Sequence, residues 1–282
     1  YLWAFGEWAN SGFSSWAHLC GRAINNPWPN RVKTAITASG TPQWRNASCS
    51  GATTANVTGS QYQDTGINGV QPINGPQKNF IDANTKAITI TLGGNDADIL
   101  GLIWKCRTTT TCTTAAGPWT SILGAGAGTV ETKLDAAYDA IQAVQPAGTK
   151  VVVVRYPAWV PDATLASGSG GACDDGIAPD YTITTAETAY IAQATRDLNQ
   201  AIVNQAAGRT GWSTVDMYGP SQAGARHDMC ATSARWLTGI DAGETNAVAW
   251  HPTGSGQVYP MHLNDAGHAA FDTTVSAFVL AA

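Results

Sequence analysis

The sequence predicts an α/β protein in which a central, mainly parallel β-sheet lies between two layers of helices. Short runs rich in β-branched residues alternate along the 282-residue chain with longer segments of helical periodicity. Apolar residues make up 44% of the chain, which is enough for a sizeable core. Together these observations indicate a three-layer α/β/α sandwich, built as a single domain over residues 1–282.

Four short apolar runs are the expected strands. Their length and their β-branched content are typical of strands that a parallel sheet buries on both faces. A glycine or a proline follows each of the first three runs directly, as expected where a strand ends. The runs cover residues 2–5, 87–92, 151–156 and, with a weaker pattern, 213–217.

Helices are expected between and after these strands, at residues 29–36, 129–144, 184 onward and 265–280. In the second helix the apolar residues share one face, namely Val130, Leu134, Tyr138, Ile141 and Val144. The third helix starts at a capping-box pattern, Thr184 with Glu187 three residues later. Its buried stripe is expected to be Tyr190, Ala194, Leu198 and Ile202. Long irregular loops are expected at residues 106–120 and 157–182.

The composition argues against several classes of partner. Charged residues make up only 12% of the chain, the net charge is −5 and no basic run occurs, so no nucleic acid is expected to bind. The longest aliphatic run, residues 151–154, is far too short for a transmembrane segment. The sequence implies no metal and no cofactor, and the chain is expected to be a monomer.

Six cysteines are present, namely Cys20, Cys49, Cys106, Cys112, Cys173 and Cys230. An even number without a C-x-x-C pair predicts disulfides and an oxidising, extracellular compartment. A zinc site is the alternative, although the ligand spacing does not fit one. The chain opens on an apolar segment at Tyr1, which is expected for a processed, secreted protein. Asn46 and Asn56 stand in glycosylation sequons, which matter only in a host that glycosylates.

Two glycine-containing segments are candidates for chemistry, because active sites in parallel sheets lie beyond the carboxyl ends of the strands. In Gly93-Gly94-Asn95-Asp96 the glycines allow a tight turn, and the Asn95 amide can donate a hydrogen bond into a site. An ordinary turn is the alternative. Gly51, which follows Cys49-Ser50, can offer its backbone N–H to an anion, or can simply form a turn beside a disulfide.

The histidines differ in their sequence context. His262 stands shortly before the last expected helix, in the segment His262-Leu263-Asn264-Asp265-Ala266-Gly267-His268, and is the candidate base. His18, His227 and His251 have no comparable context, so a structural role is the simpler interpretation of each.

Taken together, these segments resemble the SGNH (GDSL) family of esterases and lipases. Its members carry a GDS block near the N-terminus, a glycine block, a GGND-like block and a late histidine block. The matching segments occur here in that order, as Gly6-Glu7-Trp8-Ala9-Asn10-Ser11-Gly12, CSGATT, GGND and HLNDAGH, and VVVVRYP resembles a further family segment. The resemblance spans most of the chain. It implies an SGNH-hydrolase-like, flavodoxin-like fold and secretion. It also implies disulfides paired in sequence order, Cys20–Cys49, Cys106–Cys112 and Cys173–Cys230.

The resemblance also implies a carboxylic ester hydrolase, an esterase or lipase, that acts on a small-molecule ester or lipid by a serine mechanism. His262 takes the place of the base. The oxyanion donors correspond to the N–H of Trp8, the N–H of Gly51 and the side chain of Asn95. Most members place an aspartate three residues before the histidine. Tyr259 stands there in this chain, and its backbone carbonyl is the expected acceptor for the His262 ring.

The nucleophile position departs from the family pattern, because Trp8 stands where members carry serine, and an indole is not a nucleophile. Four explanations are open: the chain has lost hydrolysis, the local sequence is in error, Ser11 acts from a displaced turn, or the tryptophan was engineered. A second function of a different class is therefore a protein that binds a lipid or glycan without hydrolysing it. The eleven tryptophans offer stacking surfaces for this, although most are equally expected as core or loop anchors.

Overall fold

The computed structural model describes residues 31–32, 45, 47–49, 51–64, 70–108, 112, 128–165, 173, 183–231, 233–237 and 263–280. Its central sheet consists, in this part of the chain, of β3 (Ala87–Ile90), β4 (Lys150–Val154) and β5 (Trp212–Val215), in the order β3-β4-β5. Both pairings are parallel. The four valines of β4 are at most 1% exposed, so the middle strand is buried on both faces, as parallel strands require.

Three of the four expected strands are confirmed. Each starts within one residue of the expected position and ends two residues before the apolar run does. The last two residues of each run, such as Thr91 and Leu92 after β3, therefore lead from the sheet into the following loop. The expected strand at residues 2–5 lies outside the described residues, and of the expected helix at residues 29–36 only Arg31 and Val32 are described, both helical.

The main helices are α4 (Val130–Gln142), α5 (Thr185–Ala206) and α8 (Asp265–Leu280). The capping box is confirmed, because the Thr184 hydroxyl accepts from Glu187 N at 3.3 Å while the Glu187 carboxylate accepts from Thr184 N at 2.9 Å. Helix α4 buries the expected face except for Val144, which is 40% exposed because the helix already ends at Gln142.

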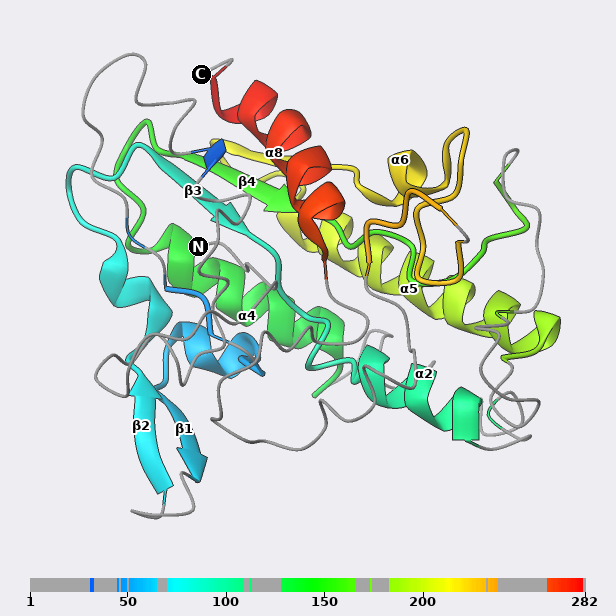
Figure 1. Ribbon diagram of the computed structural model, residues 1–282. Coiled ribbons are helices and arrows are strands. Elements are labelled where there is room, and N and C mark those ends of the chain that lie inside the picture. Colours follow the sequence, from blue (N-terminus) through cyan, green and yellow to red (C-terminus); the bar gives the residue numbers. More distant parts are fainter. Residues whose placement is uncertain are drawn as a thin grey trace, which may run out of the picture.

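These helices cover the two faces of the sheet. Helices α4 and α5 pack against each other, α5 also contacts β5, and α8 contacts β4 and β5. Figure 1 shows α8 crossing the strands on one side, with α4 and α5 on the other. Tyr138 of α4 contacts Trp212 of β5, with ring centroids 5.0 Å apart. The predicted α/β class and layers are thus confirmed, while the single-domain organisation stays a prediction.

Several elements were not expected. They are the 3-10 helices η1 (Thr54–Val57) and η2 (Gln77–Phe80), the antiparallel hairpin of β1 (Gln61–Asp64) and β2 (Val70–Asn74), and the helices α2 (Ile99–Thr108) and α6 (Tyr218–Gln222). The expected loop at residues 106–120 is wrong at its start, because residues 106–108 form the last turn of α2. The sequence did not predict this helix, because Gly101 interrupts the segment. A Cβ at position 101 would lie within 2.5 Å of the Asp98 carboxylate, so that side chain would have to move to admit one.

The cysteines form disulfides rather than a zinc site. Cys106 pairs with Cys112 and Cys173 pairs with Cys230, as the family pattern implies. Cys49 is also disulfide-bonded, and its expected partner Cys20 lies outside the described residues. Among the residues that the structure describes, none of the helices combines the length and the hydrophobicity needed to cross a bilayer.

Two buried aspartates connect the loop after β4 to the segment that carries Cys230. Asp162, 1% exposed, accepts from the Tyr218 hydroxyl at 2.7 Å and from Thr164 N at 2.9 Å, and forms an ion pair with Arg196. The backbone N–H of Asp162 donates to the side-chain oxygen Oε1 of Gln222 at 3.1 Å.

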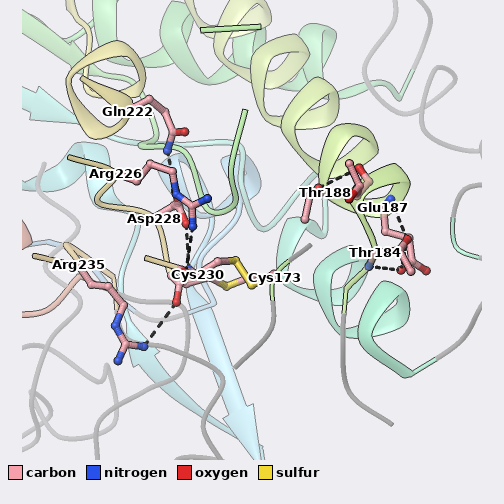
Figure 2. Close-up of a disulfide and its surroundings, with 11 residues drawn as sticks. Cys173, Thr184, Glu187, Thr188, Gln222, Arg226, Asp228, Cys230 and Arg235 are labelled. Carbon is pink, nitrogen blue, oxygen red and sulfur yellow. Dashed lines mark hydrogen bonds and ion pairs between the residues drawn. A yellow bond between two sulfur atoms is a disulfide. The ribbon is translucent and has the colours of Figure 1, made fainter. Parts of the chain in front are cut away.

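Asp228 is fully buried next to the Cys173–Cys230 disulfide (Figure 2). Its carboxylate accepts from Gln222 Nε2 at 3.0 Å and from Cys230 N at 2.9 Å, and Arg226 Nε lies 3.1 Å away. Gln222 therefore bridges the two aspartates, one through each end of its amide group.

The pKa values of the two carboxyl groups are shifted in opposite directions. Burial raises the pKa of Asp228 above its usual range, although the hydrogen bond from Gln222 and the charge of Arg226 oppose this. Burial also acts to raise the pKa of Asp162. The hydrogen bonds from Tyr218, Thr164 and Arg196 outweigh it there, so the pKa of Asp162 lies below its usual range.

We therefore expect the stability cost of Asp228→Asn to be larger at acidic than at neutral pH, and the cost of Asp162→Asn to show the reverse. A raised folded-state pKa means that Asp228 stabilises the fold increasingly as the pH falls from neutrality toward its unfolded pKa of about 3.9. The lowered pKa of Asp162 stabilises the fold above that value, and this contribution is lost as the pH falls through the folded-state pKa. A difference of one pKa unit corresponds to about 1.4 kcal/mol.

Urea unfolding of the chain and both variants, from about pH 3 to about pH 7, measures these costs. The two aspartates serve as controls for each other, because both are buried and both contact Gln222. A larger cost of Asp228→Asn at neutral pH would contradict the prediction. It would show that Arg226 stabilises the ionised carboxylate more than burial destabilises it.

Candidate active site

The GGND segment forms a tight turn just beyond the carboxyl end of β3. Gly93 has a φ of +105°, which favours glycine, and a Cβ there would lie 3.3 Å from both Leu134 and Leu198 in the layer of α4 and α5. Backbone bonds close the turn, from Ala97 N to the Gly93 carbonyl at 2.9 Å and from Asp98 N to the Asn95 carbonyl at 3.2 Å. The Asn95 side chain is thereby presented on an exposed surface at this end of the sheet.

Tyr156, just beyond the carboxyl end of β4, supports this turn. Its phenol oxygen accepts from Gly94 N at 2.9 Å, and a Cβ on Gly94 would lie 2.8 Å from that oxygen. Asn199 of α5 holds the Tyr156 backbone at both ends, accepting from its N–H at 2.8 Å and donating to its carbonyl at 3.0 Å. Burial and the nearby Asp96 carboxylate raise the pKa of Tyr156, so the phenol stays neutral at physiological pH.

The second glycine segment forms a turn that closes with a bond from Ala52 N to the Cys49 carbonyl at 3.1 Å. Gly51 is the third residue of this turn, with a φ of +73° that favours glycine. The Gly51 N–H takes no part in the bond that closes the turn, and Gly51 itself is exposed. This N–H is therefore not used by the turn itself, and its role as a donor to a ligand stays a prediction.

Two long-range contacts join these segments. The Asn95 amide donates to the Ala52 carbonyl at 2.8 Å, next to Gly51. The Asp96 carboxylate accepts from Thr54 N at 2.8 Å and from the Thr54 hydroxyl at 2.7 Å. The structure thus brings together Gly51 and Asn95, the two expected oxyanion residues that it describes. Their catalytic role stays a prediction.

The segment after His262 is described from Leu263 onward. Leu263 pairs with Leu237, and Asn264 donates to the Arg235 carbonyl at 2.7 Å, so residues 235–237 support the start of the last helix. Asn264 also accepts from Gly267 N at 3.0 Å, which caps α8. The helix begins at Asp265, three positions after His262, as expected.

The remaining expected site residues, Trp8, Ser11, Tyr259 and His262, lie outside the described residues, as do His18 and His251. His227 is described, and its ring stacks on Trp236 with centroids 4.5 Å apart while Nδ1 lies 2.6 Å from the Ala234 carbonyl. These contacts give His227 a packing role. Within the described ranges, no cluster of three or more His, Cys, Asp or Glu residues is arranged to hold a metal ion.

Sequence reasoning missed three supporting residues of this site, Thr54, Tyr156 and Asn199. Tyr156 lies in the VVVVRYP segment and Thr54 in the CSGATT segment, so both stood in stretches that the family pattern had marked. Asn199 carried no signal, because it lies within a helix and acts on a residue 43 positions away.

The fold and the site define a class: α/β proteins that gather hydrogen-bond donors beyond the carboxyl ends of a parallel sheet. The sequence profile of the GDSL-like lipase/acylhydrolase family matches residues 10–270, a region that starts two residues after Trp8. The chain therefore belongs to this family of ester hydrolases.

The chain is also similar in sequence to a curated lipase and in fold to a solved lipase. A lipase from Streptomyces rimosus is 27% identical over 207 residues, which cover 72% of this chain and 68% of that lipase. The crystal structure of an extracellular lipase from Streptomyces rimosus has the same fold, with a TM-score of 0.62 at 22% identity. The match covers 94% of this chain and 89% of the solved one.

Proposed function

We propose that this chain is built as a secreted carboxylic ester hydrolase of the lipase or esterase type. The observation that carries this proposal is the hydrogen bond from the Asn95 amide to the Ala52 carbonyl. It sets a side-chain N–H donor beside the Gly51 turn at the carboxyl end of the sheet. Two convergent N–H donors are what a tetrahedral oxyanion requires. The family membership and the disulfides, which are typical of oxidising compartments, support the same proposal.

In the mechanism proposed for the Trp8→Ser chain, the introduced hydroxyl attacks the acyl carbon while His262 takes its proton. The carbonyl oxygen becomes an oxyanion, which the Gly51 N–H, the Asn95 amide and the N–H of residue 8 stabilise. The oxyanion then collapses and the alcohol leaves with the proton from His262. Water, activated by the same histidine, hydrolyses the acyl-enzyme. The Tyr259 carbonyl orients the His262 ring by accepting a hydrogen bond from it.

Trp8 favours a second candidate function for the chain as printed. An indole forms no acyl-enzyme, so the same site would bind a lipid or glycan without cleaving it. The exposed residues Asn95 and Gly51 would then offer polar contacts to the bound molecule.

A fluorophosphonate probe, combined with peptide mass mapping of residue 8, separates these functions. We expect no labelling of a chain verified to carry Trp8, because no serine is activated, and stoichiometric labelling of the Trp8→Ser variant at the changed position. Labelling at Ser11 in the chain with Trp8 would instead identify Ser11 as the nucleophile. Absence of labelling in both proteins would contradict the hydrolase proposal.

A further inference from the structure

Asp96, the last residue of the GGND turn, is held by Thr54 at both carboxylate oxygens. Oδ2 accepts from Thr54 N at 2.8 Å and Oδ1 accepts from the Thr54 hydroxyl at 2.7 Å. The two residues lie 42 positions apart in the chain, and Thr54 is only 6% exposed. This pair is therefore a specific tertiary contact with its donors and acceptors matched, rather than a surface contact.

The Asp96–Thr54 pair lies next to both expected oxyanion donors. Asp96 directly follows Asn95, and Thr54 lies three residues after Gly51. Together with the bond from Asn95 to Ala52, the pair makes three hydrogen bonds between residues 52–54 and residues 95–96. Without Asp96, the Asn95 amide would have to hold the two segments together with the same group that is expected to bind the oxyanion.

We propose that Asp96 is a positioning residue that fixes the Gly51 N–H and the Asn95 amide relative to each other. This inference rests on the proposed function of those two donors. An oxyanion needs its donors within about 2.7–3.1 Å, and a misplacement of about 1 Å costs about 100-fold in rate. Asp96 acts through Thr54 and Asn95, and has no contact with the substrate.

The choice of an aspartate matches the two donors that it meets. A carboxylate offers one acceptor oxygen to the Thr54 N–H and one to the Thr54 hydroxyl. Its charge strengthens both hydrogen bonds. Asparagine could keep the same geometry, because its oxygen accepts from the Thr54 N–H while its NH₂ donates to the hydroxyl oxygen. The geometry and the charge of Asp96 can therefore be tested separately.

The first test measures kinetics in the Trp8→Ser background. We expect Asp96→Ala to lower kcat by about 10- to 100-fold with KM within about threefold, because the donors matter most in the transition state. Asp96→Asn should recover kcat to within about fivefold of the background. The stoichiometry of fluorophosphonate labelling and the pH dependence set by His262 should stay unchanged, which a loss of folded protein would not allow.

Asp197→Ala is the matched control. Asp197 is exposed on α5 and accepts from Gln193 Nε2 at 2.7 Å, so its removal deletes a carboxylate remote from the site. Thr54→Val should lower kcat less than Asp96→Ala, since the Thr54 N–H remains, and combining the two should add little to Asp96→Ala alone. If Asp96→Ala keeps kcat within about twofold of an active Trp8→Ser background, Asp96 does not position the donors, and the proposed function still stands.

The second test needs no activity and uses the chain as printed. We expect Asp96→Ala to speed amide hydrogen exchange in residues 51–57 by at least about tenfold, because the Thr54 N–H loses its acceptor and the turn is released. Asp197→Ala should leave this exchange unchanged. If Trp8→Ser proves inactive, the proposed function fails. The hydrogen exchange then still tests whether Asp96 holds residues 51–57 in place. Unchanged exchange in the Asp96→Ala chain would overturn the inference.

Discussion

The Trp8→Ser variant is expected to hydrolyse a short p-nitrophenyl ester at least about 10⁴ times faster than the chain as printed. Removal of the serine from a well-studied serine protease costs about 10⁶ in turnover, so its return here has a large effect. The gain is expected to stay below that value, because Glu7, with its longer side chain, stands where the family pattern has an aspartate. The initial rate per milligram of purified protein measures the gain.

Two control variants identify the groups responsible for this gain. His262→Ala in the Trp8→Ser background should remove most of it, because no base then takes the serine proton. Ser11→Ala should leave it intact. Hydrolysis by a chain verified to carry Trp8, followed by its loss on Ser11→Ala, would show that the nucleophile is Ser11.

The Asn95→Ala variant in the Trp8→Ser background is expected to lose about 10²–10³ in kcat, with KM changed by less than about threefold. The Asn95 amide donates one hydrogen to the Ala52 carbonyl at 2.8 Å, which orients the group and leaves its second hydrogen for the oxyanion. Because charge on the substrate oxygen develops only in the transition state, the loss should appear in kcat.

Asn204→Ala provides the matched control. Asn204 is an exposed amide on α5 whose contacts, to Gln200 at 2.7 Å and Glu131 at 3.4 Å, lie on the helix surface. Its removal should leave both kinetic constants unchanged. An Asn95→Ala variant that keeps kcat within about twofold would show that the amide is no oxyanion donor.

Much of the fold could be predicted from local patterns. A short run of β-branched residues, such as residues 151–154, predicts a buried strand. The structure places this run in β4, where the sheet buries it. Thr184 and Glu187 satisfy each other within one helical turn, so their spacing alone predicted where α5 begins. The hairpin of β1 and β2 could not be predicted in this way, because QYQD and VQPIN show no clear alternation of apolar residues and the second run contains Pro72.

The site could be predicted only in part, for a related reason. GGND was visible because glycines, an amide and a carboxylate are adjacent in sequence. The bond from Gly94 to Tyr156, and that from Asp96 to Thr54, join residues 62 and 42 positions apart. No spacing within a segment encodes such pairs. The first pair arises only once the sheet sets the ends of β3 and β4 side by side, and the second only once η1 lies beside the turn after β3.

The Cys173–Cys230 disulfide closes a covalent ring that contains the whole of α5, β5 and α6. A protease that cuts the chain once between these cysteines would therefore leave both fragments attached, and the cut protein would keep its full mass until the disulfide was reduced. The packing of α5 against α4 and of β5 against β4 would hold the cut ends in place. A single cleavage in this part of the chain need not separate the elements that surround β5 and α5.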